Sequence, residues 1–209
     1  WFPNIQSNLP FPLLVKLIDA QDTLSIQVHP DDQTAQMIHQ DPWGKTEMWY
    51  ILQVQKDAKI YCGFDEKYSL QHIKEALDKA QDISPFLKCF YPKKGDVFFV
   101  PSGTVHAVGA GCVLLEVQRN SDRTYRISDW GRTDEQGKSR TLHIKEALRA
   151  LSQQDHSFYK TNKLTQNGCL DLVDCPWFKI QKYDYNALEN QSHLLPEKDG
   201  MIFVLSGEG

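Results

Sequence analysis

Residues 95–106 read Gly-Asp-Val-Phe-Phe-Val-Pro-Ser-Gly-Thr-Val-His, and this stretch decides the fold that we expect for the chain. The unbroken apolar run from Val97 to Val100 is typical of a short strand buried on both faces. A glycine precedes that strand, and Pro101 and Gly103 can turn the chain out of it again. His106 follows three residues later, so we expect its imidazole at the mouth of a β-rich core rather than on a helix.

The spacing of this stretch resembles the second sequence motif of the cupins, which are small jelly-roll barrels that hold a metal ion. A glycine, five residues, a proline, one residue, a glycine and two residues precede the histidine. We therefore expect a mainly β fold, a cupin barrel with helical insertions. Helical periodicity predicts those insertions at Gln33–Gln40, Ser69–Asp82 and Thr141–Leu151.

Length and composition set outer limits on the function. The 209 residues are 41% hydrophobic and 24% charged, which is enough to bury the core of one large domain or two small ones. The formal net charge of −4 disfavours broad attraction to nucleic acid or to an anionic membrane. The sequence contains no run of 18 apolar residues, so it predicts no membrane-spanning helix. Five scattered cysteines without a Cys-x-x-Cys pair disfavour a disulfide framework or a thiolate zinc site, and they favour a reducing cytoplasm.

Two further segments offer metal ligands. The residues Leu24–His29 alternate between apolar and polar, which places Gln27 and His29 on one face of a strand. This polar face could equally lie in water. Glu47 lies in an aromatic-rich strand, Lys45–Leu52, where a carboxylate is costly to bury unless it is paired or bound to metal. A salt bridge from Glu47 to Lys45 is the alternative there.

Together, Gln27, His29, Glu47 and His106 offer two imidazoles, one carboxylate and one amide oxygen, a set that suits a zinc ion. The absence of thiolates favours a catalytic site with open coordination positions over a closed structural site. Three other histidines have simpler interpretations. We expect His39 and His72 on helix surfaces and His143 in a structural role.

The segment from Arg119 to Arg132 contains four arginines among acidic and aromatic residues. A charged loop in water is one interpretation. The other is binding of a phosphate group, because clustered guanidinium groups beside a metal site suit that ligand.

Four segments resemble those of type I mannose-6-phosphate isomerases in their short bacterial, firmicute-like form. The segments are 25–32, 44–50, 101–107 and 115–132, and the resemblance extends over nearly all of residues 11–150. It implies metal ligation by His29, Glu47 and His106, with Gln27 as the fourth ligand. It further implies the following roles: Arg126 as catalytic arginine, Ser25 and Lys45 at the substrate phosphate, and Glu116 and Asp122 in proton transfer. For the base that moves the proton, the chemistry leaves Glu116, Lys45 and an imidazole-linked water open.

The resemblance implies an enzyme with one zinc ion per chain that interconverts mannose 6-phosphate and fructose 6-phosphate through an enediol intermediate. It also implies a metal-binding barrel over residues 1–155 and the beginning of a second, incomplete cupin-like barrel over residues 156–209, in which we expect a strand at Met201–Leu205. The alternatives are an iron-dependent dioxygenase, an isomerase of another sugar phosphate, and a non-catalytic sugar-binding cupin. The sequence leaves the oligomeric state open between a monomer and a weak dimer.

Overall fold

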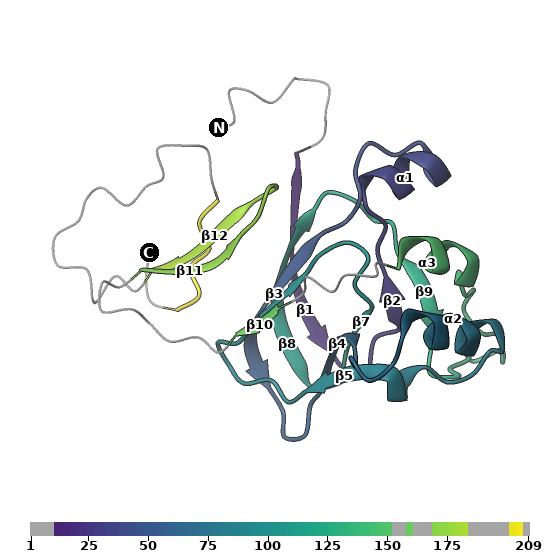
Figure 1. Cartoon of the computed structure of the whole chain (residues 1–209). Coiled ribbons are helices and arrows are strands. Elements are labelled where there is room, and N and C mark those ends of the chain that lie inside the picture. The colour runs from purple at the N-terminus through teal and green to yellow at the C-terminus, as the bar shows by residue number, and fades with distance from the viewer. Residues whose placement is uncertain (1–10, 152–157, 161–168, 184–200, 207–209) are drawn as a thin grey trace, which may run out of the picture.

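Two five-stranded antiparallel sheets face each other in the computed structural model, which describes residues 11–151, 158–160, 169–183 and 201–206 (Figure 1). Sheet A contains, in spatial order, β1 (Leu13–Ala20), β8 (Cys112–Arg119), β3 (Glu47–Val54), β6 (Val97–Val100) and β10 (Phe158–Lys160). Sheet B contains β5 (Leu87–Phe90), β4 (Ile60–Phe64), β7 (His106–Val108), β2 (Ile26–Val28) and β9 (Tyr125–Ser128). The predicted mainly β fold with helical insertions is confirmed.

The inner faces of the two sheets form the first hydrophobic core. Trp49, Phe98 and Leu114 from sheet A pack in one cluster with Ile60 and Val108 from sheet B, and all five are almost completely buried. Strand β6 is buried along its whole length, as its apolar run predicted. Alternate residues of β3 point to this core because side chains of a strand alternate between its faces.

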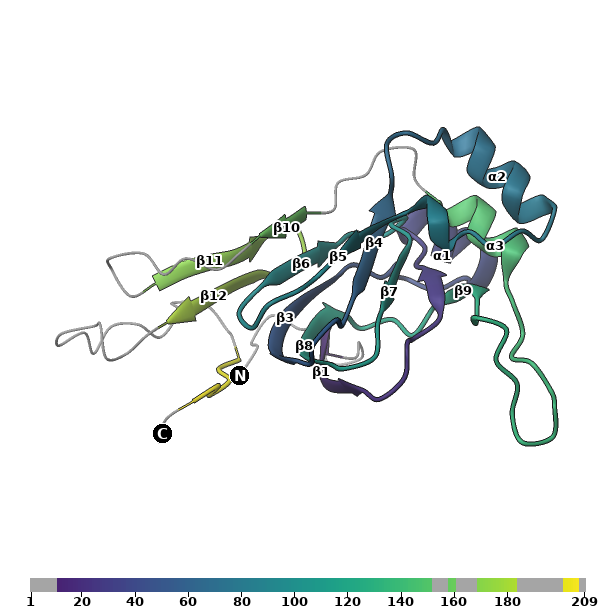
Figure 2. The ribbon, with the colours of Figure 1, turned by 90° about the horizontal axis from the view of Figure 1, so that it is seen from below.

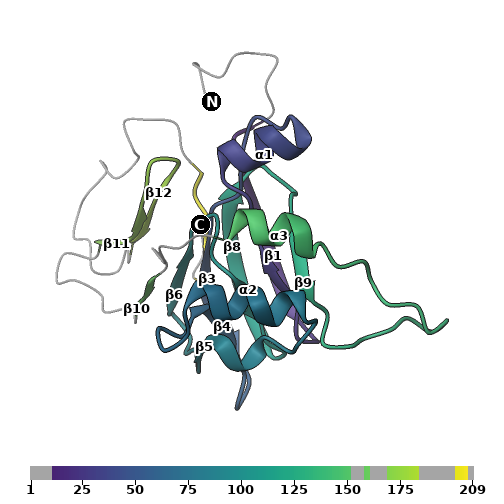
Figure 3. The same ribbon diagram turned by 45° about the vertical axis from the view of Figure 1, so that its right-hand side comes forward.

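The outer face of sheet B is covered by helices rather than by water. Figure 3 shows α2 (Leu70–Asp78) and α3 (Ile144–Ala150) in front of this sheet, and their apolar sides share a core cluster with Ile26 and Val28 of β2. Ser69 caps α2 by accepting a hydrogen bond from the His72 amide. The third helix, α1 (Asp32–His39), follows β2 and is capped by Asp31. Since the apolar face of β2 packs under helices, its polar face points into the barrel.

The outer face of sheet A is covered by the hairpin of β11 (Cys169–Asp174) and β12 (Lys179–Tyr183). Leu172, Val173 and Phe178 of this hairpin share a core cluster with Met48 and Phe99. Figure 2 shows the hairpin alongside this sheet, on the side away from the helices. Part of the region after residue 156 therefore stabilises the first barrel by burying its outer surface.

The expectations for the end of the chain have mixed outcomes. The predicted strand at Met201–Leu205 is wrong, because residues 201–206 are exposed and contain no strand. Strand β10 joins sheet A through β6, although it follows residue 156. The division at residue 156 and the incomplete second barrel stay predictions. The three prolines in residues 1–12 predict an irregular arm and the polar residues 152–166 predict a linker, but both segments lie mostly outside the described residues. Among the described helices, none has the length and apolar character needed to cross a membrane.

Candidate metal centre

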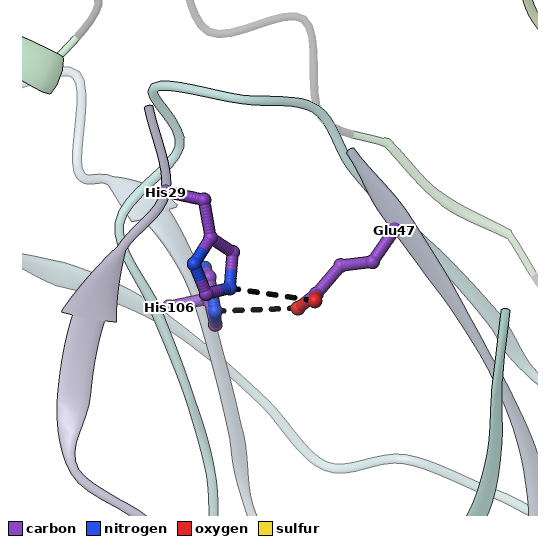
Figure 4. Close-up of side chains that lie close together, drawn as sticks. All are labelled: His29, Glu47 and His106. Atoms are coloured by element: carbon purple, nitrogen blue, oxygen red, sulfur yellow. Dashed lines mark ion pairs between the residues drawn. The ribbon is translucent and has the colours of Figure 1, made fainter. Parts of the chain in front are cut away.

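Three strands bring one carboxylate and two imidazoles together. His29 lies directly after β2, His106 is the first residue of β7, and Glu47 is the first residue of β3. Strands β2 and β7 are neighbours in sheet B, whereas β3 belongs to sheet A, so Glu47 approaches the histidines from the opposite wall of the barrel (Figure 4). The fold thereby gathers residues that are 77 positions apart in sequence, counted from His29 to His106.

The three side chains converge on one point and are each only 1% exposed. Glu47 Oε2 lies 3.3 Å from His29 Nε2, and Glu47 Oε1 lies 3.3 Å from His106 Nε2. One candidate ligand atom from each residue lies within 4.8 Å of the others. His29 Nε2 and both carboxylate oxygens are buried and have no hydrogen-bond partner among the described residues. Buried polar atoms are rarely left unsatisfied, so this arrangement fits a bound cation.

The orientation of each imidazole is fixed from behind. His29 Nδ1 lies 2.9 Å from the carbonyl oxygen of Arg123, and His106 Nδ1 lies 2.9 Å from that of Thr104. A carbonyl oxygen can only accept, so each Nδ1 carries the proton and donates it. The Nε2 lone pairs therefore face Glu47. A histidine that ligates a metal is commonly oriented by such a second hydrogen bond.

The charge state of the cluster also suits a cation. Burial lowers the pKa of His29 to about 4, and burial lowers the pKa of His106 as well. Burial alone would raise the pKa of Glu47, but Lys45 and the two imidazoles outweigh it and hold that pKa well below its usual range. At neutral pH the cluster presents one carboxylate and two neutral imidazoles, which are the protonation states that metal binding requires.

Lys45, Gln27 and Ser25 border the cluster. Lys45 is 5% exposed, and its Nζ lies 3.3 Å from Glu47 Oε2, so the salt bridge weighed from the sequence is present beside the candidate ligand set. Gln27 Nε2 lies 3.2 Å from His106 Nε2, while its Oε1 accepts a hydrogen bond from Ser25 Oγ at 3.2 Å. Rotation of this amide by about 180° would present Oε1 to the centre, as ligation by Gln27 requires.

Glu116 lies deeper in the barrel, on the inner face of β8. It accepts hydrogen bonds from Lys16 Nζ at 2.9 Å and from Trp49 Nε1 at 3.2 Å. Burial, reinforced by the charge of Glu47, raises the pKa of Glu116. Sequence reasoning missed Lys16. No signal in the sequence points to it, because only the pairing of β1 with β8 in the folded chain sets Lys16 directly opposite Glu116.

Arg126 lies in the same row of sheet B as two of the candidate ligands. In the register of the sheet, Gln27 pairs with His106 on one side and with Arg126 on the other. Directly paired residues of antiparallel strands share a face, so Arg126 borders the mouth of the cluster. The Arg126 guanidinium donates to the Thr141 carbonyl at 2.8 Å. Asp122 is exposed, and within the described part of the chain no hydrogen bond or ion pair joins it to the cluster.

The other arginines of this segment are paired with carboxylates. Arg119, Arg123 and Arg132 form ion pairs, respectively, with Asp32, Asp41 and Asp129. Among the described residues, Arg126 has no such partner, and its Nε is buried without a hydrogen bond. The fold therefore singles out one of four guanidinium groups as an available positive charge.

Three further histidines lie apart from the cluster. His72 is exposed on α2, as expected. His143 stands at the start of α3, where its Nδ1 accepts a hydrogen bond from the Arg126 amide. The expectation for His39 needs correction, because it is half-buried and its Nε2 lies 2.9 Å from the Tyr125 hydroxyl.

Comparisons with known proteins agree on one family. The family model for the catalytic domain of type I phosphomannose isomerase matches residues 4–64. The mannose-6-phosphate isomerase ManA of Bacillus subtilis is 36% identical over 206 residues, which cover 95% of this chain and 63% of that protein. A mannose-6-phosphate isomerase of Streptococcus mutans is 37% identical over 210 residues, which cover 100% of this chain and 65% of that protein.

Solved structures give the same result. The crystal structure of the mannose 6-phosphate isomerase from Bacillus subtilis superimposes with a TM-score of 0.71 at 35% identity, covering 83% of this chain and 56% of that one. A single-residue variant of phosphomannose isomerase from Salmonella typhimurium has a TM-score of 0.59 at 18% identity and covers 78% of this chain and 60% of that one, which supports the fold alone. The chain spans slightly less than two thirds of the curated relatives that it matches.

Proposed function

We propose that the chain belongs to the type I phosphomannose isomerase family, to which it is similar, and that it carries the metal centre of an enzyme that interconverts mannose 6-phosphate and fructose 6-phosphate. The single observation that carries this proposal is the buried cluster of His29, Glu47 and His106, in which His29 Nε2 and both Glu47 oxygens face one another across the barrel with no hydrogen-bond partner in the described chain. A sugar phosphate is accordingly the proposed substrate.

The proposed ion is zinc, one per chain, held by His29, Glu47 and His106 with Gln27 as fourth ligand. Two imidazole nitrogens, a carboxylate and an amide oxygen, without any thiolate, suit zinc in a catalytic rather than a structural site. When bound, such an ion supplies Lewis-acid stabilisation of negative charge on substrate oxygens. The hydrogen bonds from each Nδ1 keep both imidazoles turned toward the centre.

Arg126 is the proposed catalytic arginine. Isomerisation moves a proton between C1 and C2 of the sugar, and the enediol route develops negative charge on the adjacent oxygens. Arg126 borders the cluster in the register of sheet B, and its guanidinium has no carboxylate partner in the described chain. A fixed, protonated guanidinium can stabilise that developing charge without reorganising.

Glu116 is the proposed group that moves the proton. Its raised pKa brings a carboxyl closer to the working pH, which is what a residue that both accepts and returns a proton needs. Lys16 and Trp49 hold the carboxylate in place by hydrogen bonds. Lys45 is a second candidate because it is buried beside Glu47. Asp122 is a weaker candidate for proton transfer, because its side chain is exposed.

Contact with the substrate phosphate is proposed for Ser25 and Lys45. Both side chains are buried at the border of the cluster, where they can bind a group that enters the barrel mouth. The binding energy of the phosphate then holds the sugar in the geometry that the reaction requires.

The proposal is tested on the purified protein by elemental analysis together with a coupled assay on mannose 6-phosphate. We expect one zinc ion per chain and isomerase activity that a chelator abolishes and zinc restores. Oxygen consumption, measured in parallel, would indicate an iron-dependent dioxygenase instead of an isomerase. Binding of the sugar phosphate without turnover would indicate a non-catalytic cupin. A metal-free protein with full isomerase activity would contradict the proposed centre.

We propose the cytoplasm as the location of the protein. All five cysteines are free thiols, including the buried Cys62 and Cys112, and this usage is typical of a reducing compartment. Fractionation of cells that produce the protein, followed by immunoblotting, tests this location.

A further inference from the structure

The segment Thr141–His143 holds Arg126 from the open edge of sheet B. The Arg126 amide donates to His143 Nδ1 at 3.1 Å, and the His143 amide donates to the Arg126 carbonyl at 2.8 Å. The Arg126 side chain donates from Nη1 to the Thr141 carbonyl at 2.8 Å. The described contacts of the Arg126 guanidinium therefore depend on where the backbone of Thr141 lies.

Thr141 stands at the end of a long arm that leaves the body of the molecule after β9. Figures 2 and 3 show this arm, residues 131–142, projecting away from both sheets. Its residues are exposed apart from the half-buried Arg132. The hydrogen bonds around Asp134 join residues of the arm to one another, so its returning end still needs an anchor to the body of the molecule to stay in one place.

Asp129 provides that anchor at the base of the arm. Its side chain is buried, and both of its oxygens bind Arg140, one of them accepting from Arg140 Nε at 2.7 Å. This two-pronged pair is the geometry in which arginine and carboxylate fix each other most firmly. Since Arg140 immediately precedes Thr141, the pair fixes the carbonyl that receives Arg126.

Arg132 makes a comparable bond at the departing end of the arm. Its Nη2 donates to Asp129 Oδ1 at 2.6 Å, and its Nε donates to the Asp129 carbonyl at 3.1 Å. No described hydrogen bond runs from Arg132 or its chain neighbours to Arg126. Arg132 and Arg140 thus share one carboxylate and carry the same charge, but only Arg140 is connected to the residue that holds Arg126.

From this arrangement we infer that Asp129 and Arg140 are positioning residues, which fix the Arg126 guanidinium at the mouth of the metal cluster through the Thr141 carbonyl. The inference deepens the proposed function and rests on it. The shared carboxylate forms ion pairs with Arg132 and Arg140 but none with Arg126, whose charge stays available to substrate.

The test compares Arg140→Ala with Arg132→Ala, a control that removes the same charge from the same carboxylate. We expect Arg140→Ala to lower kcat by about 10- to 100-fold, because small misplacement of a catalytic group has costs of this order. We expect the KM for mannose 6-phosphate and the metal stoichiometry to change little, and Arg132→Ala to stay close to wild type. Arg140→Lys, which keeps one donor for Asp129, should recover part of the rate.

A double variant distinguishes positioning from general damage. In an Arg126→Ala background, adding Arg140→Ala should lower kcat almost no further, because the guanidinium that Arg140 positions is already absent. Losses that multiply in the double variant, or equal losses from Arg132→Ala and Arg140→Ala, would overturn the inference. Thermal unfolding of each variant shows whether it is folded.

A spectroscopic measurement keeps the inference testable without turnover. The NMR signal of the Arg126 Nε–H group, assigned by its absence in Arg126→Ala, should shift or broaden in Arg140→Ala and stay in place in Arg132→Ala. An unchanged signal in both variants would refute the positioning role even in an active enzyme. If the wild-type protein lacked isomerase activity while the Arg126 signal still shifted or broadened in Arg140→Ala, the proposed function would be refuted and the positioning role would stand.

Discussion

The two ends of the barrel interior are built by the same strands but have opposite chemistry. Strand β3 begins with Glu47 and continues to Ile51, and β7 begins with His106 and ends with Val108. At the polar end, His29 Nε2 and the two Glu47 oxygens face one another without a hydrogen bond to any described residue, whereas at the apolar end Ile51 and Val108 pack in a continuous core. Burying the polar groups costs folding free energy, so we attribute their presence to function. Burying the apolar groups stabilises the fold.

The largest expected effect is the loss of metal from the polar end. His106→Ala should remove the bound ion and lower isomerase turnover by more than about 10³-fold, because the electrostatic stabilisation supplied by the ion is lost with it. Elemental analysis and the coupled assay measure both quantities. The matched control is His72→Ala on the exposed surface of α2, which should behave as wild type. Full metal stoichiometry in His106→Ala would show that the ligand assignment is wrong.

Arg126→Ala sharpens the comparison within the polar end by separating binding of the ion from the reaction. This variant should keep its metal and lose about 10²- to 10³-fold in kcat, the cost of removing one stabiliser of developing charge. Steady-state kinetics and elemental analysis on the same sample measure both. Near-normal kcat would remove Arg126 from the mechanism.

The apolar end is probed by Leu114→Ala, which opens a cavity beside Trp49 and Phe98. Leu114 is 0% exposed, so the free energy of unfolding should fall by about 2–5 kcal/mol. Urea denaturation measures this change, and the folded variant should still bind one metal ion. Leu17→Ala, at a side chain that is 69% exposed, is the control and should cost about 0.5 kcal/mol or less. Loss of metal from folded Leu114→Ala would mean that the two ends are not separable.

The smallest effect lies outside both ends, at Asp129. The hydrogen bond from Arg140 is the main reason that the pKa of Asp129 is lowered to about 2. A carboxyl with a lowered folded-state pKa stabilises the protein above its unfolded pKa of about 4, and this stabilisation is lost as pH falls through the folded value.

Asp129→Asn should therefore reduce the free energy of unfolding at neutral pH by on the order of 1 kcal/mol, since solvent screens the exposed arginines. As the pH falls from about 4 to about 2, the free energy of unfolding of Asp129→Asn should decrease less than that of the wild-type protein. Urea denaturation across this pH range measures both, with Asp22→Asn at an exposed position as control. Parallel acid profiles for Asp129→Asn and wild type would contradict the lowered pKa.

The sequence by itself determined the strand alternation, and with it the residues that could meet inside a barrel. The side-chain period of two placed Glu47, Trp49 and Ile51 on one face of β3, and the structure confirms that this face is the inner one. Spacing around His106 predicted a strand that ends at a barrel mouth. Capping chemistry predicts Asp31 or Asp32 at one helix start and Ser69 at another, because such side chains satisfy free amides locally, and the structure has Asp31 and Ser69 as caps.

Only the tertiary structure decided which polar groups meet and which are already paired. Strand register set Lys16 opposite Glu116 and Arg126 beside Gln27, and register depends on contacts between strands that are distant in sequence. The four arginines of the segment after β8 look equivalent in sequence, yet three pair with carboxylates: Arg119 and Arg123 with the distant Asp32 and Asp41, and Arg132 with the nearby Asp129. The polar face of β2 likewise became an interior face only because helices, rather than water, cover its apolar side.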